Sequence, residues 1–305
     1  MPQPPPVRYF RAGDVRLAYR HWTLAPRPGL PGLAGLAAAA GPPVVLLHAL
    51  GEQSANWSAV ASALGASQPV YAPDLRGHGA SDRAGQYTVA ALIADVTVLF
   101  DALGLRSAIL VGHSTGGAAA YQFAARHPDR VSRLILEEPA PPWPLPSRPL
   151  TRPAGPLDFD WDVTALSAEL RDPPPSWREA LGLIAAPTLI VAGGPASHVD
   201  QHLLAEMASL IPRCELITIP AGHLVHAARP AEFTAAVAGF LRGSQLPPPH
   251  PEGAATIEAT GRRGSWKQPT GPVGAEGRRQ CHLLSLIPAR SSASSRTSWH
   301  QAPAK

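Results

Sequence analysis

The chain has 305 residues, of which 45% are hydrophobic, so it is long enough to bury a large core in one domain or two. Its net charge of +4 arises at the C-terminal end, because residues 245–305 hold eight Lys and Arg against three acidic residues. The rest of the chain is close to neutral, which excludes a basic, nucleic-acid-binding body.

The elements expected along the chain alternate between strands and helices. The chain opens with a predicted β-hairpin. Its two strands are Val7 to Arg11 and Val15 to Trp22, and Gly13-Asp14 lies in the turn between them. The continuous apolar runs that follow are typical of strands buried on both faces of a parallel sheet, and the segments between them have helical periodicity. The expected strands are 44–48, 69–74, 108–112, 131–137, 188–192 and 215–219, and the expected helices are 56–64, 88–103, 115–127, 202–210 and 231–241. The predicted fold class is α/β: a mostly parallel open sheet with helices on both faces, whose ligands gather at the carboxyl ends of the strands.

Two segments depart from this alternation. Residues 139–186 are rich in Pro, carry three Trp and one Phe, and have helical patterns only over 163–170 and 177–184. We expect a short lid there, the alternative being a surface loop whose tryptophans pack on the core. Residues 245–305 have no periodicity and predict a disordered, low-complexity tail. The expected organisation is one domain over residues 1–244, which contains the lid, followed by the tail.

The two cysteines, Cys214 and Cys281, are too far apart for a metal knuckle or a disulfide framework, so we expect a reducing, cytoplasmic setting. The start of the chain has no basic region followed by an apolar one, as a secretory signal would. The stretch 30–50 has no charged residue, but Pro and Gly interrupt it. We therefore expect a loop that leads into a buried strand rather than a membrane span. We expect a small-molecule substrate and no metal, cofactor, nucleic acid or membrane, and the oligomeric state stays open.

The stretch from Ser107 to Gly117 contains Gly-His-Ser-Thr-Gly between an apolar strand and an Ala-rich helix. In this context the pentapeptide predicts a nucleophile elbow, with Ser114 at a strained strand-to-helix turn. Gly112 and Gly116 let neighbouring segments come close, and a side chain at either position should clash. The turn leaves the first helical amides unpaired, so the N–H group of Thr115 is a candidate donor to a developing oxyanion.

Four motifs follow the expected strands in order. They are His48-Ala-Leu-Gly51, Asp74-Leu-Arg-Gly-His-Gly-Ala-Ser-Asp82, Gly112-His-Ser-Thr-Gly116 and Ile219-Pro-Ala-Gly-His223. Together they make the segment from about Val7 to Leu241 resemble the α/β-hydrolase fold superfamily, of the short-lid, single-domain kind. The resemblance implies a serine hydrolase with a Ser-acid-His triad, whose histidine lies in the last of the four motifs.

A serine hydroxyl is a poor nucleophile at neutral pH and needs a histidine that a carboxylate orients. His223 follows a buried strand and a Pro-Ala-Gly turn, so we favour it over His226, three residues later. The commonest family pattern has an Asp shortly after the strand that precedes the last one. This chain has Ala196 and Ser197 at that point, and Asp200 comes too late.

Some relatives place the acid after the sixth strand instead. Glu138 occupies that place by register, with Glu137 as the alternative. Glu138 also preserves the chain order Ser, acid, His. The predicted catalytic residues are therefore Ser114, His223 and Glu138, against the alternative that both glutamates merely form a solvated strand end.

The resemblance implies that two backbone amides bind the oxyanion: that of Thr115 and that of Leu50, with Ala49 second to Leu50. The expected activity is cleavage of an ester, thioester or lactone of a small, fairly apolar substrate through an acyl-enzyme. One alternative is hydrolysis of a C–C bond in a diketone-like substrate by the same triad. Another is a non-catalytic ligand-binding member of the fold, which the missing acid after Gly194 favours.

Deleting residues 245–305 should leave the melting temperature and the esterase activity nearly unchanged, because this segment lacks the periodic apolar residues needed to join a core. The shortened chain should also lose most of its affinity for anionic resins. Thermal unfolding of the full and shortened chains is the measurement. A large fall in melting temperature would show that the tail docks on the body.

Overall fold

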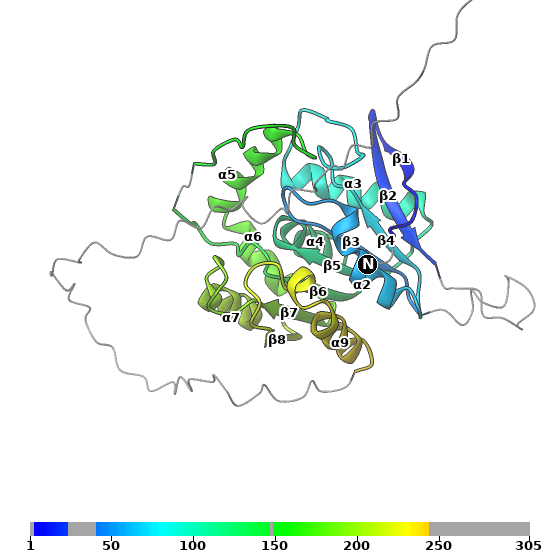
Figure 1. Ribbon diagram of the computed structural model, residues 1–305. Helices are drawn as coiled ribbons and strands as arrows, with labels where there is room; N and C mark the ends of the chain where they lie inside the picture. Colours follow the sequence, from blue (N-terminus) through cyan, green and yellow to red (C-terminus); the bar gives the residue numbers. More distant parts are fainter. Residues whose placement is uncertain (1–2, 24–40, 147–148, 244–305) are drawn as a thin grey trace, which may run out of the picture. The chain divides into compact units, whose positions relative to one another are not determined.

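The computed structural model describes residues 3–23, 41–146 and 149–243 (Figure 1). The predicted tail and most of the connection between the hairpin and the first parallel strand lie outside the described residues. The described strands form one sheet in the order β1-β2-β4-β3-β5-β6-β7-β8. Their bounds are β1 Arg8–Ala12, β2 Val15–Trp22, β3 Val44–Leu47, β4 Val70–Pro73, β5 Ala108–His113, β6 Val131–Glu137, β7 Thr188–Ala192 and β8 Cys214–Thr218.

The sheet is antiparallel at one edge and parallel elsewhere. β2 pairs antiparallel with both β1 and β4, and every pair from β4 to β8 is parallel. All residues of β3, β5 and β7 are buried, as expected of strands covered on both faces. The expected strands therefore match the observed ones to within two residues.

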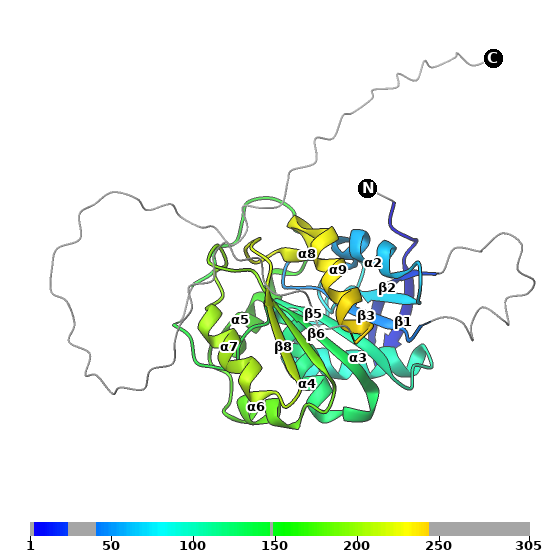
Figure 2. The same ribbon diagram turned by 90° about the horizontal axis from the view of Figure 1, so that it is seen from below.

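Helices cover both faces of the sheet. Figure 2 shows α2 and α9 on one side and α3 and α4 on the other. The aromatic side chains of Trp57 and Phe233 lie in the core between the sheet and the first pair of helices. The α-helices are α2 Ser58–Leu64, α3 Val89–Ala102, α4 Ser114–Arg126, α5 Leu166–Arg171, α6 Ser176–Glu179, α7 Gln201–Leu210, α8 Val225–Ala228 and α9 Pro230–Leu241, and the 3-10 helices are η1 Ser54–Trp57, η2 Pro128–Arg130, η3 Trp161–Ala165 and η4 Ala180–Leu183. This arrangement confirms the predicted fold class.

The order of the strands brings the candidate residues together. β5, β6, β7 and β8 are consecutive neighbours and run in the same direction, so the loops after them emerge at one edge. Ser114 follows β5, Glu138 follows β6 and His223 follows β8. The sheet thus places Ser114 and His223, more than 100 positions apart in the sequence, at the same edge.

The insertion at 139–186 forms short helices and buries three of its four aromatic side chains. Trp143, Phe159 and Trp177 are buried, and the carbonyl of Trp177 accepts a hydrogen bond from Gln122 of α4. This is the packing that the surface-loop alternative describes. The ring of Phe159 also stacks on that of His78, with 5.8 Å between centroids, so one part of the insertion covers a motif loop. Its action as a lid stays a prediction.

Two glycines at the elbow are required by close backbone approaches. A Cβ atom on Gly116 would lie 2.5 Å from the carbonyl oxygens of Leu47 and His48, at the end of β3. A Cβ atom on Gly112 would lie 2.5 Å from the carbonyl oxygen of Gly116. Both are backbone contacts that no side-chain rotation relieves, so they bear out the expected clash.

Replacing Gly116 with Ala should lower the free energy of unfolding by about 1–3 kcal/mol, because the backbone of β3 or α4 must shift. The matched control is Gly182→Ala, where the new methyl group meets no atom within 4 Å. That change should be neutral or stabilise by about 0.4–1 kcal/mol. Urea unfolding of both variants measures the difference, and equal stabilities would contradict the close approach.

Candidate active site

The elbow places Ser114 at the first residue of α4 with a φ of 51°. The preceding residue, His113, is still extended, with φ −104° and ψ 130°. A non-glycine residue in the left-handed region carries strain of order 1–3 kcal/mol, which persists only where the surroundings impose it. The half-buried Ser114 side chain is thereby held at the carboxyl end of β5, at the start of a helix.

Glu138 has the same unusual backbone, with a φ of 44°, and its side chain is fully buried. The carboxylate accepts hydrogen bonds from the Gly193 amide and the Ser197 hydroxyl, and from Gln201 Nε2 at 3.2 Å. Its Oε2 also lies 3.4 Å from His223 Nδ1. Burial raises the pKa of Glu138, but these hydrogen bonds, that of His223 first, outweigh it and lower the pKa below its usual value.

His223 lies against the residue that precedes the candidate nucleophile. Its carbonyl oxygen is 2.9 Å from His113 Nε2, and the centroids of the two rings are 4.7 Å apart. Burial lowers the pKa of His223 below its ordinary value in spite of Glu138, so the imidazole is neutral at pH 7 and able to accept a proton. Among the described side chains, no hydrogen bond joins Ser114 Oγ to the His223 ring; such bonds often tighten only when substrate is bound.

The other two carboxylates weighed in the sequence analysis have different partners. Glu137 is fully buried and accepts hydrogen bonds from the backbone and the ring of His226, with Nδ1 at 2.8 Å. Asp200 caps α7 by accepting from the backbone amide of His202 at 2.9 Å. The structure therefore brings Glu138, and neither Glu137 nor Asp200, to the His223 ring.

Ser197 stands where the common pattern has an acid, and its hydroxyl donates to Glu138. The sequence analysis registered only that an acid is missing there. The contact shows a hydroxyl and a backbone amide of the β7 loop supporting the carboxylate that extends from β6. No sequence pattern marked Ser197 or Gln201 as partners of Glu138, because the contacts join residues 59 and 63 positions apart.

The amides expected to bind an oxyanion differ in availability. Neither Leu50 nor Thr115 donates its backbone N–H to an acceptor within the described residues. The amide of Ala49, the second choice, donates to Glu52 Oε2 at 3.0 Å and is therefore engaged. His78 Nε2 accepts a hydrogen bond from the Gly51 amide at 3.1 Å, so a second side chain fixes the loop that contains Ala49 and Leu50.

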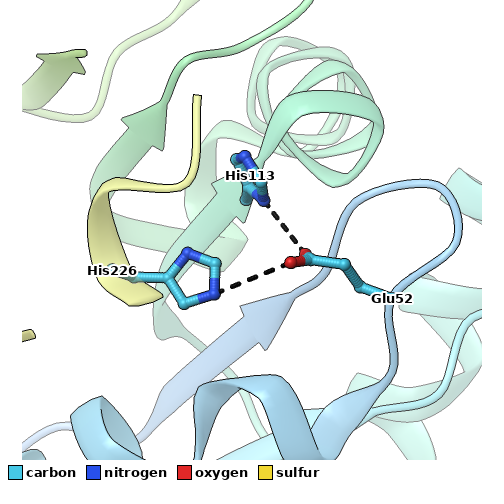
Figure 3. A group of neighbouring side chains, drawn as sticks. All are labelled: Glu52, His113 and His226. Atoms are coloured by element: carbon cyan, nitrogen blue, oxygen red, sulfur yellow. Dashed lines mark hydrogen bonds and ion pairs between the residues drawn. The ribbon is translucent and has the colours of Figure 1, made fainter. Parts of the chain in front are cut away.

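Glu52 is a largely buried polar residue, with 11% of its side chain exposed, that the sequence analysis missed. Its Oε2 lies 3.0 Å from His113 Nδ1, and its Oε1 lies 3.9 Å from His226 Nε2 (Figure 3). Burial opposes the charged form of His113, but the carboxylates of Glu137 and Glu52 outweigh it and raise the pKa of His113 to about 9. The one signal in the sequence was a charged residue directly after the His48-Ala-Leu-Gly51 loop.

The chain has extensive similarity to known proteins. A family model described as the alpha/beta hydrolase fold matches residues 42–173. Lipase LipV of Mycobacterium tuberculosis is 30% identical over 242 residues, which cover 65% of this chain and 92% of that lipase. Uncharacterized proteins of Mycobacterium tuberculosis and Mycobacterium bovis are 42% identical over 100 residues, and there the match spans 32% of this chain and 29% of those relatives.

A solved structure supports the same fold. The structure titled "Est816 as an N-Acyl homoserine lactone degrading enzyme" superimposes with a TM-score of 0.63 at 23% identity, covering 76% of this chain and all of that one. None of the described helices has the length and apolarity needed to cross a bilayer. With the sheet order, the Ser114 elbow and the near-complete coverage of a lipase at 30% identity, the chain belongs to the α/β-hydrolase fold family.

Proposed function

We propose that the chain is a serine hydrolase that cleaves an ester, thioester or lactone of a small, fairly apolar substrate. The observation that carries the proposal is the contact between Glu138 and His223 Nδ1, made at the same sheet edge as the strained Ser114 turn. That contact leaves Nε2 of His223 as the nitrogen that faces away from the carboxylate. A neutral imidazole oriented in this way is the general base that a serine nucleophile requires.

In the proposed reaction, Ser114 Oγ attacks the substrate carbonyl while His223 Nε2 accepts its proton. The negative charge that develops on the carbonyl oxygen is bound by the free amides of Thr115 and Leu50, helped by the positive end of α4. His223 then donates the proton to the leaving group as the acyl-enzyme forms. Water, activated by the same imidazole, hydrolyses the acyl-enzyme, and Glu138 holds the ring in its tautomer throughout.

The relatives and the insertion support the proposed substrate class. The similar proteins include a lipase and an enzyme titled as degrading an N-acyl homoserine lactone. The insertion supplies Trp161, half-buried beside the fully buried Phe159 with 6.4 Å between ring centroids. Aromatic side chains near the motif loops favour an apolar acyl group over a charged one.

Two alternatives remain distinct from this proposal. A C–C bond hydrolase acting on a diketone-like substrate would use the same three residues, so a diketone must accompany the ester panel in any assay. A non-catalytic ligand-binding protein would keep the fold without an activated serine. The Glu138 contact weighs against the second, because Glu138, directly after β6, substitutes for the acid missing after Gly194.

Replacing Ser114 with Ala should abolish labelling by a fluorophosphonate probe and lower ester turnover by about 10⁶-fold, since triad residues act as a unit. The control Ser176→Ala removes an exposed hydroxyl and should label as the wild type does. Turnover is measured on esters of increasing acyl length and on a β-diketone. A wild-type chain that does not label would favour the ligand-binding alternative, and a labelled Ser114→Ala variant would place the nucleophile elsewhere.

Replacing Glu138 with Gln should lower turnover by about 10⁴-fold, as when the carboxylate of a Ser-His-Asp triad is replaced, because the imidazole loses the charge that orients it. The matched control is Asp200→Asn, which keeps the cap of α7 and should cost less than about tenfold. Steady-state kinetics and circular dichroism of both variants decide the assignment. If Asp200→Asn is the variant with the large loss of turnover, Glu138 is not the triad acid.

A further inference from the structure

Beside the candidate triad lies a second group of polar side chains, Glu52, His113 and His226, which the proposed reaction does not use (Figure 3). They come from the loop after β3, the end of β5 and α8. One potential ligand atom of each lies within 4.8 Å of those of the other two. The two histidine side chains have no exposed surface, and that of Glu52 is 11% exposed.

The hydrogen bonds at the far side of each ring determine which nitrogen carries a proton. His113 Nε2 lies 2.9 Å from the carbonyl oxygen of His223, and a carbonyl only accepts, so Nε2 is the donor. His226 Nδ1 lies 2.8 and 3.0 Å from the oxygens of Glu137, so Nδ1 is the donor there. His113 Nδ1 and His226 Nε2 are left facing Glu52, as Figure 3 shows. Metal-binding histidines have this arrangement, with the outer nitrogen donating to a carbonyl or carboxylate.

One of these inner nitrogens has no hydrogen-bond partner among the described residues. His226 Nε2 is buried and has no hydrogen bond among the described residues, and its 3.9 Å separation from Glu52 Oε1 is too long for one. A proton on His113 Nδ1 would satisfy the contact to Glu52 but would leave His226 Nε2 unpaired. Glu52 and Glu137 also place two carboxylates in this interior, and within the described chain they form ion pairs with histidines only. A divalent cation would displace the proton that His113 Nδ1 shares with Glu52, bind both inner nitrogens and balance both carboxylates.

We propose that Glu52, His113 and His226 bind a divalent cation that prefers imidazole ligands, with zinc as the best fit. Zinc bound at 2.0–2.2 Å in tetrahedral geometry separates its ligand atoms by about 3.3 Å. His113 Nδ1 lies 3.0 Å from Oε2 of Glu52 and His226 Nε2 lies 3.9 Å from its Oε1, so each nitrogen is near a zinc-like separation from one oxygen of the carboxylate. Two imidazoles and a carboxylate suit zinc, whereas magnesium and calcium take oxygen ligands.

The sequence analysis expected no metal, and this proposal departs from it. The role proposed for the cation is structural, since it would connect three segments around the catalytic residues. The cation would join the loop that carries Leu50, the strand β5, which ends at His113 just before Ser114, and the helix that follows His223. Glu137 supports the site from outside, because it holds the His226 ring by its other nitrogen. A water in the fourth position would approach from the partly exposed side of Glu52. The ion would then restrain the backbone next to Ser114 and the backbone next to His223 together.

The test uses the full chain without an affinity tag, stripped with a chelator and titrated with Zn²⁺ or Co²⁺. We expect one ion per chain with a dissociation constant of about 1 µM or tighter, a visible Co²⁺ spectrum of the tetrahedral type and a rise in melting temperature with bound metal. Glu52→Gln and His226→Gln should each weaken binding by at least about tenfold. His202→Gln, which removes an exposed histidine from α7, is the control and should bind as the wild type does.

These readouts do not involve turnover, so they succeed or fail separately from the hydrolase proposal. A wild-type chain that binds no stoichiometric metal overturns the site, whatever the variants do. Binding that is equally tight in Glu52→Gln and His226→Gln places the ion on other residues and also overturns it. Circular dichroism of the stripped variants establishes that each is folded, and Glu52→Gln, whose amide oxygen still accepts from Ala49, is the milder change.

Discussion

The candidate site depends on two strained turns at the ends of neighbouring strands. Within the part of the chain that the structure describes, Ser114 and Glu138 are the non-glycine residues with positive φ. Each directly follows a buried parallel strand, β5 or β6. Such strain costs free energy and is retained where the surroundings impose it, which is common at functional sites. The same backbone feature therefore marks both the proposed nucleophile and the proposed acid, without reference to any family.

Burial accounts for the number of hydrogen bonds around the two glutamates. A carboxylate removed from water is tolerated only when charged or polar groups replace the lost solvation. Glu138 has the amide of Gly193 and three side-chain donors, and Glu137 has the backbone and ring of His226. Adjacent residues at a strand end point to opposite sides, so the two carboxylates serve different histidines. One histidine is at the proposed reaction centre, and the other is in the proposed cation site.

The two systems meet at His113. Its Nε2 bonds to the carbonyl of His223, its Nδ1 faces Glu52, and it directly precedes Ser114 in the chain. Glu52 in turn holds the amide of Ala49, beside the candidate oxyanion donor Leu50. A change in the group around Glu52 should therefore alter the backbone of the elbow, the histidine loop and the oxyanion loop together. This connection gives the buried cluster a physical means of influencing the site without contact to substrate.

The sequence by itself determined the fold class, most element bounds and the residues to consider. Continuous apolar runs identify β3, β5 and β7 because strands buried on both faces consist mostly of apolar residues. The Gly-x-Ser-x-Gly context identifies Ser114 because the turn demands small neighbours. Only the tertiary structure decided which carboxylate reaches His223, because Glu137 and Glu138 are adjacent in sequence and are separated by the direction of their side chains. The Glu52 cluster was likewise invisible, since His113 and His226 are 61 and 174 residues from Glu52 along the chain and meet it only when β3, β5 and α8 pack at one edge of the sheet.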